Sequence, residues 1–252
     1  MPSQRQEPVH FSDLQQRLSG HIYSLYMNYS FLIKGGVYTV ASMSLFHILT
    51  ENEAFQKGRF GFWLASFGLS VVTIAKWSRG SVMAAPAATM LDVLLPIAIG
   101  IPEYLLFIVL DPMFTLSWTY WYVVAAIHSA LALALVGNRL KQTKTSHYDP
   151  ELLPLVEKYK KWMWRDLLGA GIIAAISSVL FLATRPEFGK WAILHVPGAE
   201  LRHTVIAALY LVVGIWITRQ AYFEYLDITT FSPKSEQVAQ PTAPPATPAV
   251  NV

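Results

Sequence analysis

Residues 88–110, ATMLDVLLPIAIGIPEYLLFIVL, combine a membrane-length apolar run with two carboxylates and two prolines. As a helix rising about 1.5 Å per residue, the run spans about 34 Å, against about 30 Å of bilayer hydrocarbon. Asp92 and Glu103 are eleven residues apart, which places them on one helix face. A carboxylate within hydrocarbon is normally paired, hydrated or functional. The stretch therefore predicts a transmembrane helix whose acidic face meets protein or water.

The same helix contains three residues that disturb regular helical geometry. Pro96 and Pro102 each lack a backbone N–H, and Gly100 lies between them. Each proline leaves a carbonyl one turn earlier without its partner, and lipid cannot supply one. We therefore predict a kink at Pro96, Gly100 and Pro102.

Composition places the chain among integral membrane proteins. Of its 252 residues, 54% are hydrophobic and only 14% are charged, whereas a soluble domain carries about 25% charged residues. The apolar runs are long enough for membrane helices and predict an all-α polytopic fold with six transmembrane helices. We expect the spans at about residues 30–49, 60–77, 88–110, 116–136, 167–183 and 203–218.

Three segments flank or interrupt the transmembrane domain, which covers residues 30–231. Residues 1–29 form a cytoplasmic segment in which 11–28 place apolar side chains at three- and four-residue steps, typical of an interfacial amphipathic helix. The alternative for 11–28 is the first turns of a longer first span. Residues 150–165 have a similar pattern and predict a second interfacial helix in an inner loop. The Pro- and Ala-rich residues 232–252 predict a disordered tail.

The basic residues indicate how the chain is oriented. With both termini inside, fourteen Lys and Arg lie at the inner side and five at the outer side, as the positive-inside rule requires. We therefore expect both termini to be cytoplasmic, in the inner (plasma) membrane of a bacterium. The lipid bilayer is the expected main partner. Protein partners on the basic cytoplasmic face and a homo-oligomer stay open, and no nucleic acid is expected because the basic residues flank apolar spans.

Four side chains are candidates for an ion pathway: Lys34, Asp92, Glu103 and His128. Lys34 and Asp92 both fall at the inner level, where they would pair, unless Lys34 extends to the lipid headgroups. His128 falls at the depth of Glu103, and such a pair could relay protons because histidine titrates near neutrality. The alternative is a structural histidine bonded to a neighbouring helix.

Other chemistry finds little support in the sequence. His47 and His203 fall near the outer ends of their spans, where two histidines can ligate b-type haem or a metal, but nothing in their spacing requires it. The absence of cysteine excludes thiolate-ligated clusters and disulfides. No nucleophile elbow, zinc-binding helix or phosphate loop occurs. We therefore expect no cofactor, no metal and no enzymatic activity.

Two functions remain. The first is a small channel or secondary transporter that moves a proton, a cation or a small basic solute past the acidic residues of the kinked third helix. The second is a non-catalytic subunit or scaffold that anchors a larger membrane complex. A transporter requires Asp92 or Glu103 to face a hydrated cavity, whereas a scaffold would bury them in pairs.

Overall fold

The computed structural model describes residues 13–14, 33–51, 58–83, 90–191, 193–194 and 200–231. The predicted N-terminal interfacial helix, apart from Asp13 and Leu14, and the predicted tail at 232–252 lie outside these residues. Within them the fold is all-helical, without a β-strand. Six α-helices make up the bundle: α2 (Gly35–Thr50), α4 (Arg59–Val82), α5 (Met90–Ile108), α6 (Trp121–Gln142), α7 (Leu153–Ala183) and α8 (Glu200–Thr229).

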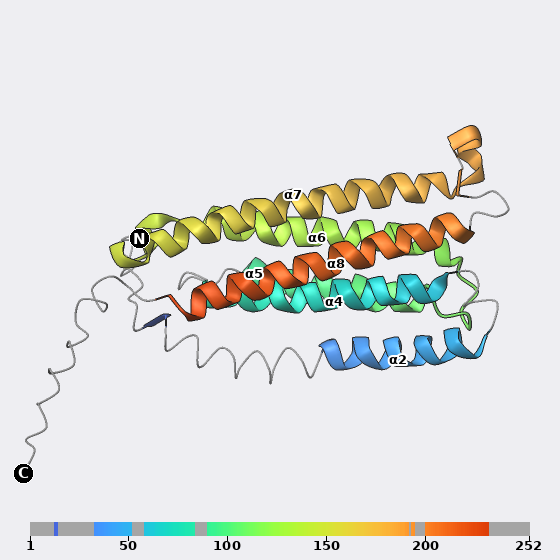
Figure 1. The fold of residues 1–252 in the computed structure, drawn as a ribbon, viewed down its shortest axis with the longest axis horizontal. Helices are drawn as coiled ribbons and strands as arrows, with labels where there is room; N and C mark the ends of the chain where they lie inside the picture. Colours follow the sequence, from blue (N-terminus) through green and yellow to red (C-terminus); the bar gives the residue numbers. More distant parts are fainter. Residues whose placement is uncertain are drawn as a thin grey trace, which may run out of the picture.

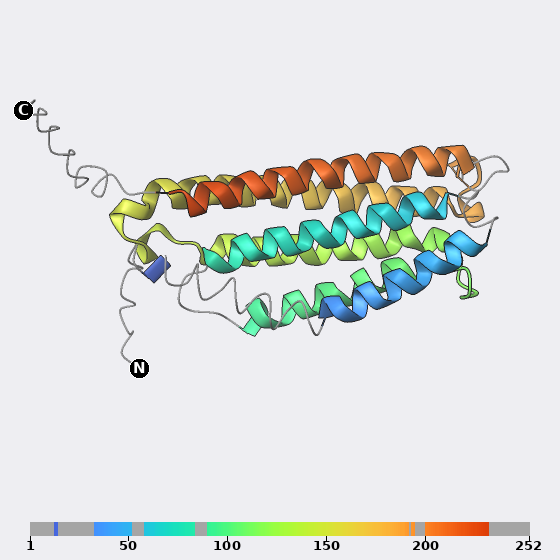
Figure 2. The ribbon, with the colours of Figure 1, turned by 60° about the horizontal axis from the view of Figure 1, so that its bottom comes forward.

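The helices lie side by side along one long axis (Figure 1). Helix α6 packs on α5 and α7, while α4 packs mainly on α8, and α2 covers α5. The largest core cluster joins aromatic and aliphatic side chains of α4, α5, α6 and α8, with Phe62, Trp121 and Tyr122 fully buried. The view in Figure 2 shows α2 and α5 forming one layer of the bundle, with α7 and α8 on the opposite side.

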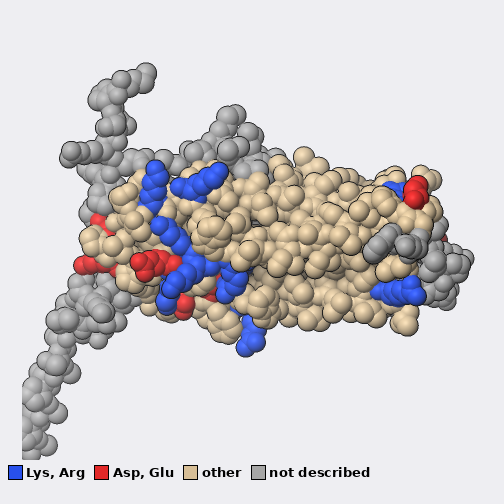
Figure 3. Space-filling view, turned by 90° about the horizontal axis from the view of Figure 1, so that it is seen from above, with Lys and Arg blue, Asp and Glu red and all other residues tan. Residues whose placement is uncertain are grey.

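Three helical segments are long and apolar enough to cross a membrane: Trp118–Gln142, Pro150–Ala183 and Glu200–Thr229. Large apolar side chains on α7 point away from the protein at helical spacing, and Leu168, Ile172, Ile176 and Val179 are each about half exposed or more. Figure 3 shows a broad surface band free of Lys, Arg, Asp and Glu between charged groups at either end. These features are those of a membrane protein.

Helix α7 differs from the sequence prediction. The sequence suggested an inner-loop helix at 150–165 followed by a separate span, but a short 3₁₀ turn at Pro150–Leu152 leads into one helix of 31 residues. No proline or glycine interrupts 155–168. The apolar face of the first turns is buried, with Leu155, Val156 and Tyr159 in a second core cluster. The first turns of α7 therefore pack their apolar face inside the bundle, and their contact with the membrane surface stays a prediction.

Helix α5 continues through Pro96, Gly100 and Pro102 without ending, and the kink stays a prediction. The structure gives Gly100 a different role. A Cβ at Gly100 would lie 2.6 Å from Cγ2 of Ile33. The missing side chain lets the residues that lead into α2 approach α5 closely.

Candidate functional site

A buried polar cluster forms where four helices converge. Lys34 immediately precedes α2, Ser70 lies on α4, Glu103 on α5 and His128 on α6. The Lys34 ammonium forms an ion pair with Oε2 of Glu103 and donates to Oγ of Ser70 at 2.8 Å. Glu103 is 0% exposed and Lys34 is 1% exposed. A charged pair buried this completely needs close geometry and further hydrogen bonds to offset its desolvation.

The close approach at Gly100 explains how Lys34 reaches Glu103. Ile33 contacts α5 at Gly100, and Glu103 follows Gly100 by three residues, nearly one helical turn. The aliphatic stem of Lys34 spans that turn. Farther along the same two helices, Oγ of Ser44 donates to the carbonyl oxygen of Phe107 at 3.1 Å. Small residues thus bring α2 and α5 together on both sides of the ion pair.

His128 adjoins the other carboxylate oxygen of Glu103. Its Nε2 lies 3.5 Å from Oε1 of Glu103 and 3.3 Å from Oγ1 of Thr73. Neither Oε1 of Glu103 nor Nδ1 of His128 has a hydrogen-bond partner in the part of the chain that the structure describes. Glu103 and His128 are therefore close together, as predicted. Each has one polar atom, Oε1 of Glu103 and Nδ1 of His128, that could accept a proton.

Asp92 lies in the first turn of α5, and its side chain is outside those described. The expected Lys34–Asp92 pair therefore stays a prediction. What the structure adds is a partner that the sequence analysis did not consider for Lys34, because Glu103 lies three turns farther along α5 than Asp92.

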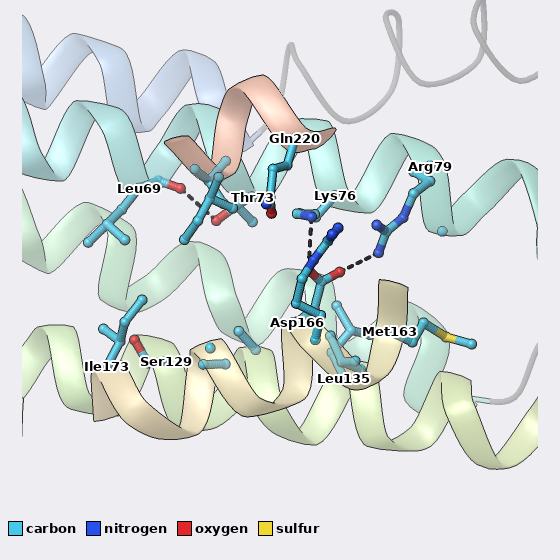
Figure 4. A pocket seen from close by; sticks show the side chains of 18 of the residues that line it. Leu69, Thr73, Lys76, Arg79, Ser129, Leu135, Met163, Asp166, Ile173 and Gln220 are labelled. Atoms are coloured by element: carbon cyan, nitrogen blue, oxygen red, sulfur yellow. Dashed lines mark hydrogen bonds and ion pairs between the residues drawn. The ribbon is translucent and has the colours of Figure 1, made fainter. Parts of the chain in front are cut away.

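A cavity of about 170 Å³ extends from His128 along the bundle. It is bounded by α4, α6, α7 and α8, with Ile99 contributed by α5. Thr73 and Ser129 supply polar groups to the cavity wall (Figure 4). The remaining wall there is mainly apolar and includes Leu69, Val72, Ile99, Ala132, Leu135, Val136, Ile173 and Ile217. Such a volume holds several water molecules or a small ligand.

Charged side chains gather at the other end of the cavity, which we call the basic end. Asp166 of α7 accepts from Lys76 at 2.8 Å and also pairs with Arg79. Glu224 of α8 pairs with Arg79 and Arg165 and accepts from Lys76 at 3.2 Å. Arg79 is additionally placed over the rings of Tyr159 and Trp162.

The sequence analysis missed this network. It singled out none of Lys76, Arg79, Asp166 and Glu224. A signal was available, because Arg79 follows the second predicted span, Asp166 precedes the fifth and Glu224 follows the sixth. In the predicted topology all three positions lie at the inner side of the membrane, where opposite charges on neighbouring helices can meet.

The two outer histidines lie apart from this site. His47 binds the carboxylate of Asp111, with Nδ1 2.9 Å from Oδ1. His203 has Nδ1 2.8 Å from the Tyr122 hydroxyl and Nε2 3.1 Å from the carbonyl oxygen of Leu194. Both ring nitrogens of His203 are thus engaged by protein groups.

The described residues contain no cluster of three or more His, Cys, Asp or Glu side chains arranged to hold a metal ion. No family model, curated protein or solved structure matches this chain.

Proposed function

We propose that this chain is a small membrane transporter that moves protons, alone or together with a solute, through His128 and Glu103. The observation that carries the proposal is that His128 both lines the cavity and faces Glu103, with Nε2 3.5 Å from Oε1. A titratable imidazole between a cavity and a buried carboxylate is suited to proton transfer.

The transfer needs only groups of this chain and water. Nδ1 of His128 is enclosed by protein in this structure, so the step begins with a movement that opens it to cavity water. Nδ1 of neutral His128 then takes up a proton from that water while Nε2 releases its proton to Oε1 of Glu103. The imidazole stays neutral overall and changes tautomer. Protonated Glu103 no longer balances the charge of Lys34, and the ion pair between them weakens. Loss of that pair would release the start of α2 from α5, which supplies a conformational change for alternating access.

We propose in addition that the chain crosses the membrane six times with both termini in the cytoplasm. The three long apolar segments, the bundle in which α2, α4 and α5 lie alongside them and the excess of Lys and Arg on the predicted inner side support this topology. The basic end of the cavity then faces the cytoplasm of the cell, for which we propose the bacterial inner membrane.

One observation favours the alternative of a non-catalytic scaffold. The Lys34–Glu103 pair is almost fully buried, and a scaffold would hold its intramembrane acids in such pairs. In that case Glu103 fixes the position of α2 and carries no proton. Under this alternative, protein partners or a second copy would bind at the basic end.

Proton flux into liposomes distinguishes the two functions. The purified full chain is reconstituted with a trapped pH-sensitive dye, and a potassium diffusion potential drives protons inward. We expect the wild-type rate to exceed that of empty vesicles and the Glu103→Gln rate to match them. No flux in the wild type, or unchanged flux in Glu103→Gln, would remove the transport proposal.

Further variants distinguish loss of proton transfer from loss of the folded structure. Glu187→Gln removes an exposed carboxylate in the connection between α7 and α8, and we expect wild-type flux from it. His128→Phe keeps an aromatic ring at the cavity wall without a titratable nitrogen, and we expect it to behave as Glu103→Gln. Thermal unfolding of each variant in detergent shows whether lost flux reflects lost structure.

A further inference from the structure

The basic end of the cavity carries more positive charge than its ion pairs with other described residues neutralise. Lys76, Arg79 and Arg165 share two carboxylates, Asp166 and Glu224. This group of five side chains therefore has a net charge of +1. Arg79 is only 2% exposed, and its Nε has no hydrogen-bond partner among the described residues. An unbalanced cation and an unused buried donor favour an anion at this place.

The rest of the cavity requires an apolar group. From Arg79, the wall continues along Leu69 and Val72 of α4, Ile173 of α7 and Ile217 of α8 towards His128. Figure 4 shows Lys76, Arg79 and Asp166 at one side and Leu69 and Ile173 at the other. A small inorganic anion would leave this apolar length filled only by water. A molecule with an anionic head and an apolar tail matches both parts.

The cavity also reaches the protein surface. Trp216 and Arg165 line it, yet Trp216 is 52% exposed and the Arg165 side chain is 42% exposed. Helix α7 packs mainly on α6 and α8 mainly on α4, which leaves the opening between the two helix pairs. An amphiphile from the bilayer or the adjacent solution can therefore enter with its head near the polar boundary of the membrane.

We infer that the cavity binds a single-chain anionic amphiphile, with its carboxylate or phosphate on Lys76, Arg79 and Arg165 and its alkyl chain directed towards His128. The inferred site concerns binding alone and stands whether or not protons pass through Glu103. Its volume of about 170 Å³ suits one chain better than both tails of a phospholipid.

Binding is measured on the full chain in phosphatidylcholine nanodiscs with bromodecanoate as the probe. Bromine quenches nearby tryptophan fluorescence, and the difference between wild type and Trp216→Phe isolates the signal from the cavity. Empty discs correct for partitioning into lipid. We expect saturable quenching of Trp216, and affinity that rises about fourfold per added methylene along a series of unlabelled competitors.

Two glycines provide a matched pair of variants. A Cβ at Gly169 or at Gly36 would find open space within 4 Å, but only Gly169 lines the cavity. Gly169→Leu should fill the space for the chain and abolish saturable binding, whereas Gly36→Leu should bind as wild type does. Equal binding in Gly169→Leu and wild type would overturn the inference.

The headgroup is tested separately. Arg165→Gln removes one cation but leaves Glu224 paired with Lys76 and Arg79, and it should weaken decanoate binding about tenfold. Decyltrimethylammonium should not displace the probe. Displacement by this cation as strong as by decanoate, or by inorganic phosphate at the same concentration, would contradict an anionic amphiphile.

A final arm identifies the source of the amphiphile. The decanoate titration is repeated in discs that contain phosphatidylglycerol. Weaker binding there shows that an anionic bilayer lipid occupies the same site through one of its chains, and unchanged binding points to a free amphiphile. Both results support the site, whereas unsaturable quenching in both kinds of disc overturns it.

Discussion

Lys34 and Glu103, 69 residues apart in the chain, form an ion pair inside the helix bundle. The pair links the start of α2 to α5, and Ser70 of α4 supplies a further hydrogen-bond acceptor for the ammonium group. Because neither side chain has more than 1% of its surface exposed, each depends on the other for charge balance.

The Lys34–Glu103 pair should show strong energetic coupling. Lys34→Met leaves a buried carboxylate without its counter-ion and should lower the free energy of unfolding by about 3–5 kcal/mol. The double variant Lys34→Met/Glu103→Leu removes both charges and should recover most of that loss. Denaturation of the four proteins in a double-mutant cycle measures the coupling. Additive losses would mean that the two charges do not interact.

Gly100 should be required for the approach of α2 to α5. Gly100→Val places a Cβ 2.6 Å from Cγ2 of Ile33 and should destabilise the protein by about 1–3 kcal/mol through overpacking. Ile33→Ala in the same chain should restore part of this loss because it removes the clashing methyl group. Gly36→Val is the control, since no atom lies within 4 Å of its new Cβ. Equal stability losses in the two valine variants would contradict the close approach.

Of the contacts of Glu103, the sequence predicts the one with His128 but not the one with Lys34. The number of residues from the end of each predicted span places Glu103 and His128 at the same depth, and in the structure the two side chains are close together. Lys34 was counted as lying at the inner level with Asp92, yet its side chain reaches Glu103. The Lys34–Glu103 contact depends on the distance between α2 and α5. That distance is set by the packing of Ile33 against Gly100, which the periodicity of apolar residues does not reveal.

The basic end gives a second example. The amphipathic pattern of 150–165 predicts a helix on the membrane surface. In the structure, helix α7 buries Tyr159 and Met163 in the bundle and presents Asp166 to Arg79. Amphipathic periodicity indicates that one face of a helix is covered and does not say whether lipid or protein covers it.

The network at the basic end predicts unequal effects for two acids on α8. Glu224 is 4% exposed and contacts three cations. Asp227 is 50% exposed and, among the described residues, forms an ion pair with Lys158 alone, at 3.5 Å. Glu224→Gln should destabilise the protein by about 3 kcal/mol, while Asp227→Asn should cost less than about 1 kcal/mol. Thermal unfolding of both variants tests this, and a larger loss for Asp227→Asn would show that the network contributes little.

The outer end of the bundle should depend on a hydrogen bond between Tyr122 and His203. The hydroxyl of Tyr122 lies 2.8 Å from Nδ1 of His203, and both residues are buried. Tyr122→Phe keeps the ring in the aromatic core but leaves that nitrogen without its partner, at a cost of about 1–2 kcal/mol. Tyr222→Phe, on the exposed surface of α8, should leave the melting temperature unchanged. A similar shift for both variants would mean that loss of the Tyr122 hydrogen bond is not the cause.

Proton flux through the charge-swapped variant Lys34→Glu/Glu103→Lys tests the central claim most directly. The swap keeps an ion pair between the same positions, so the transporter and scaffold accounts both allow a folded protein. It also places an ammonium group, which has no proton-accepting oxygen, beside His128. The account predicts a folded variant with flux no higher than empty vesicles, and wild-type flux from this variant would contradict proton transfer through Glu103.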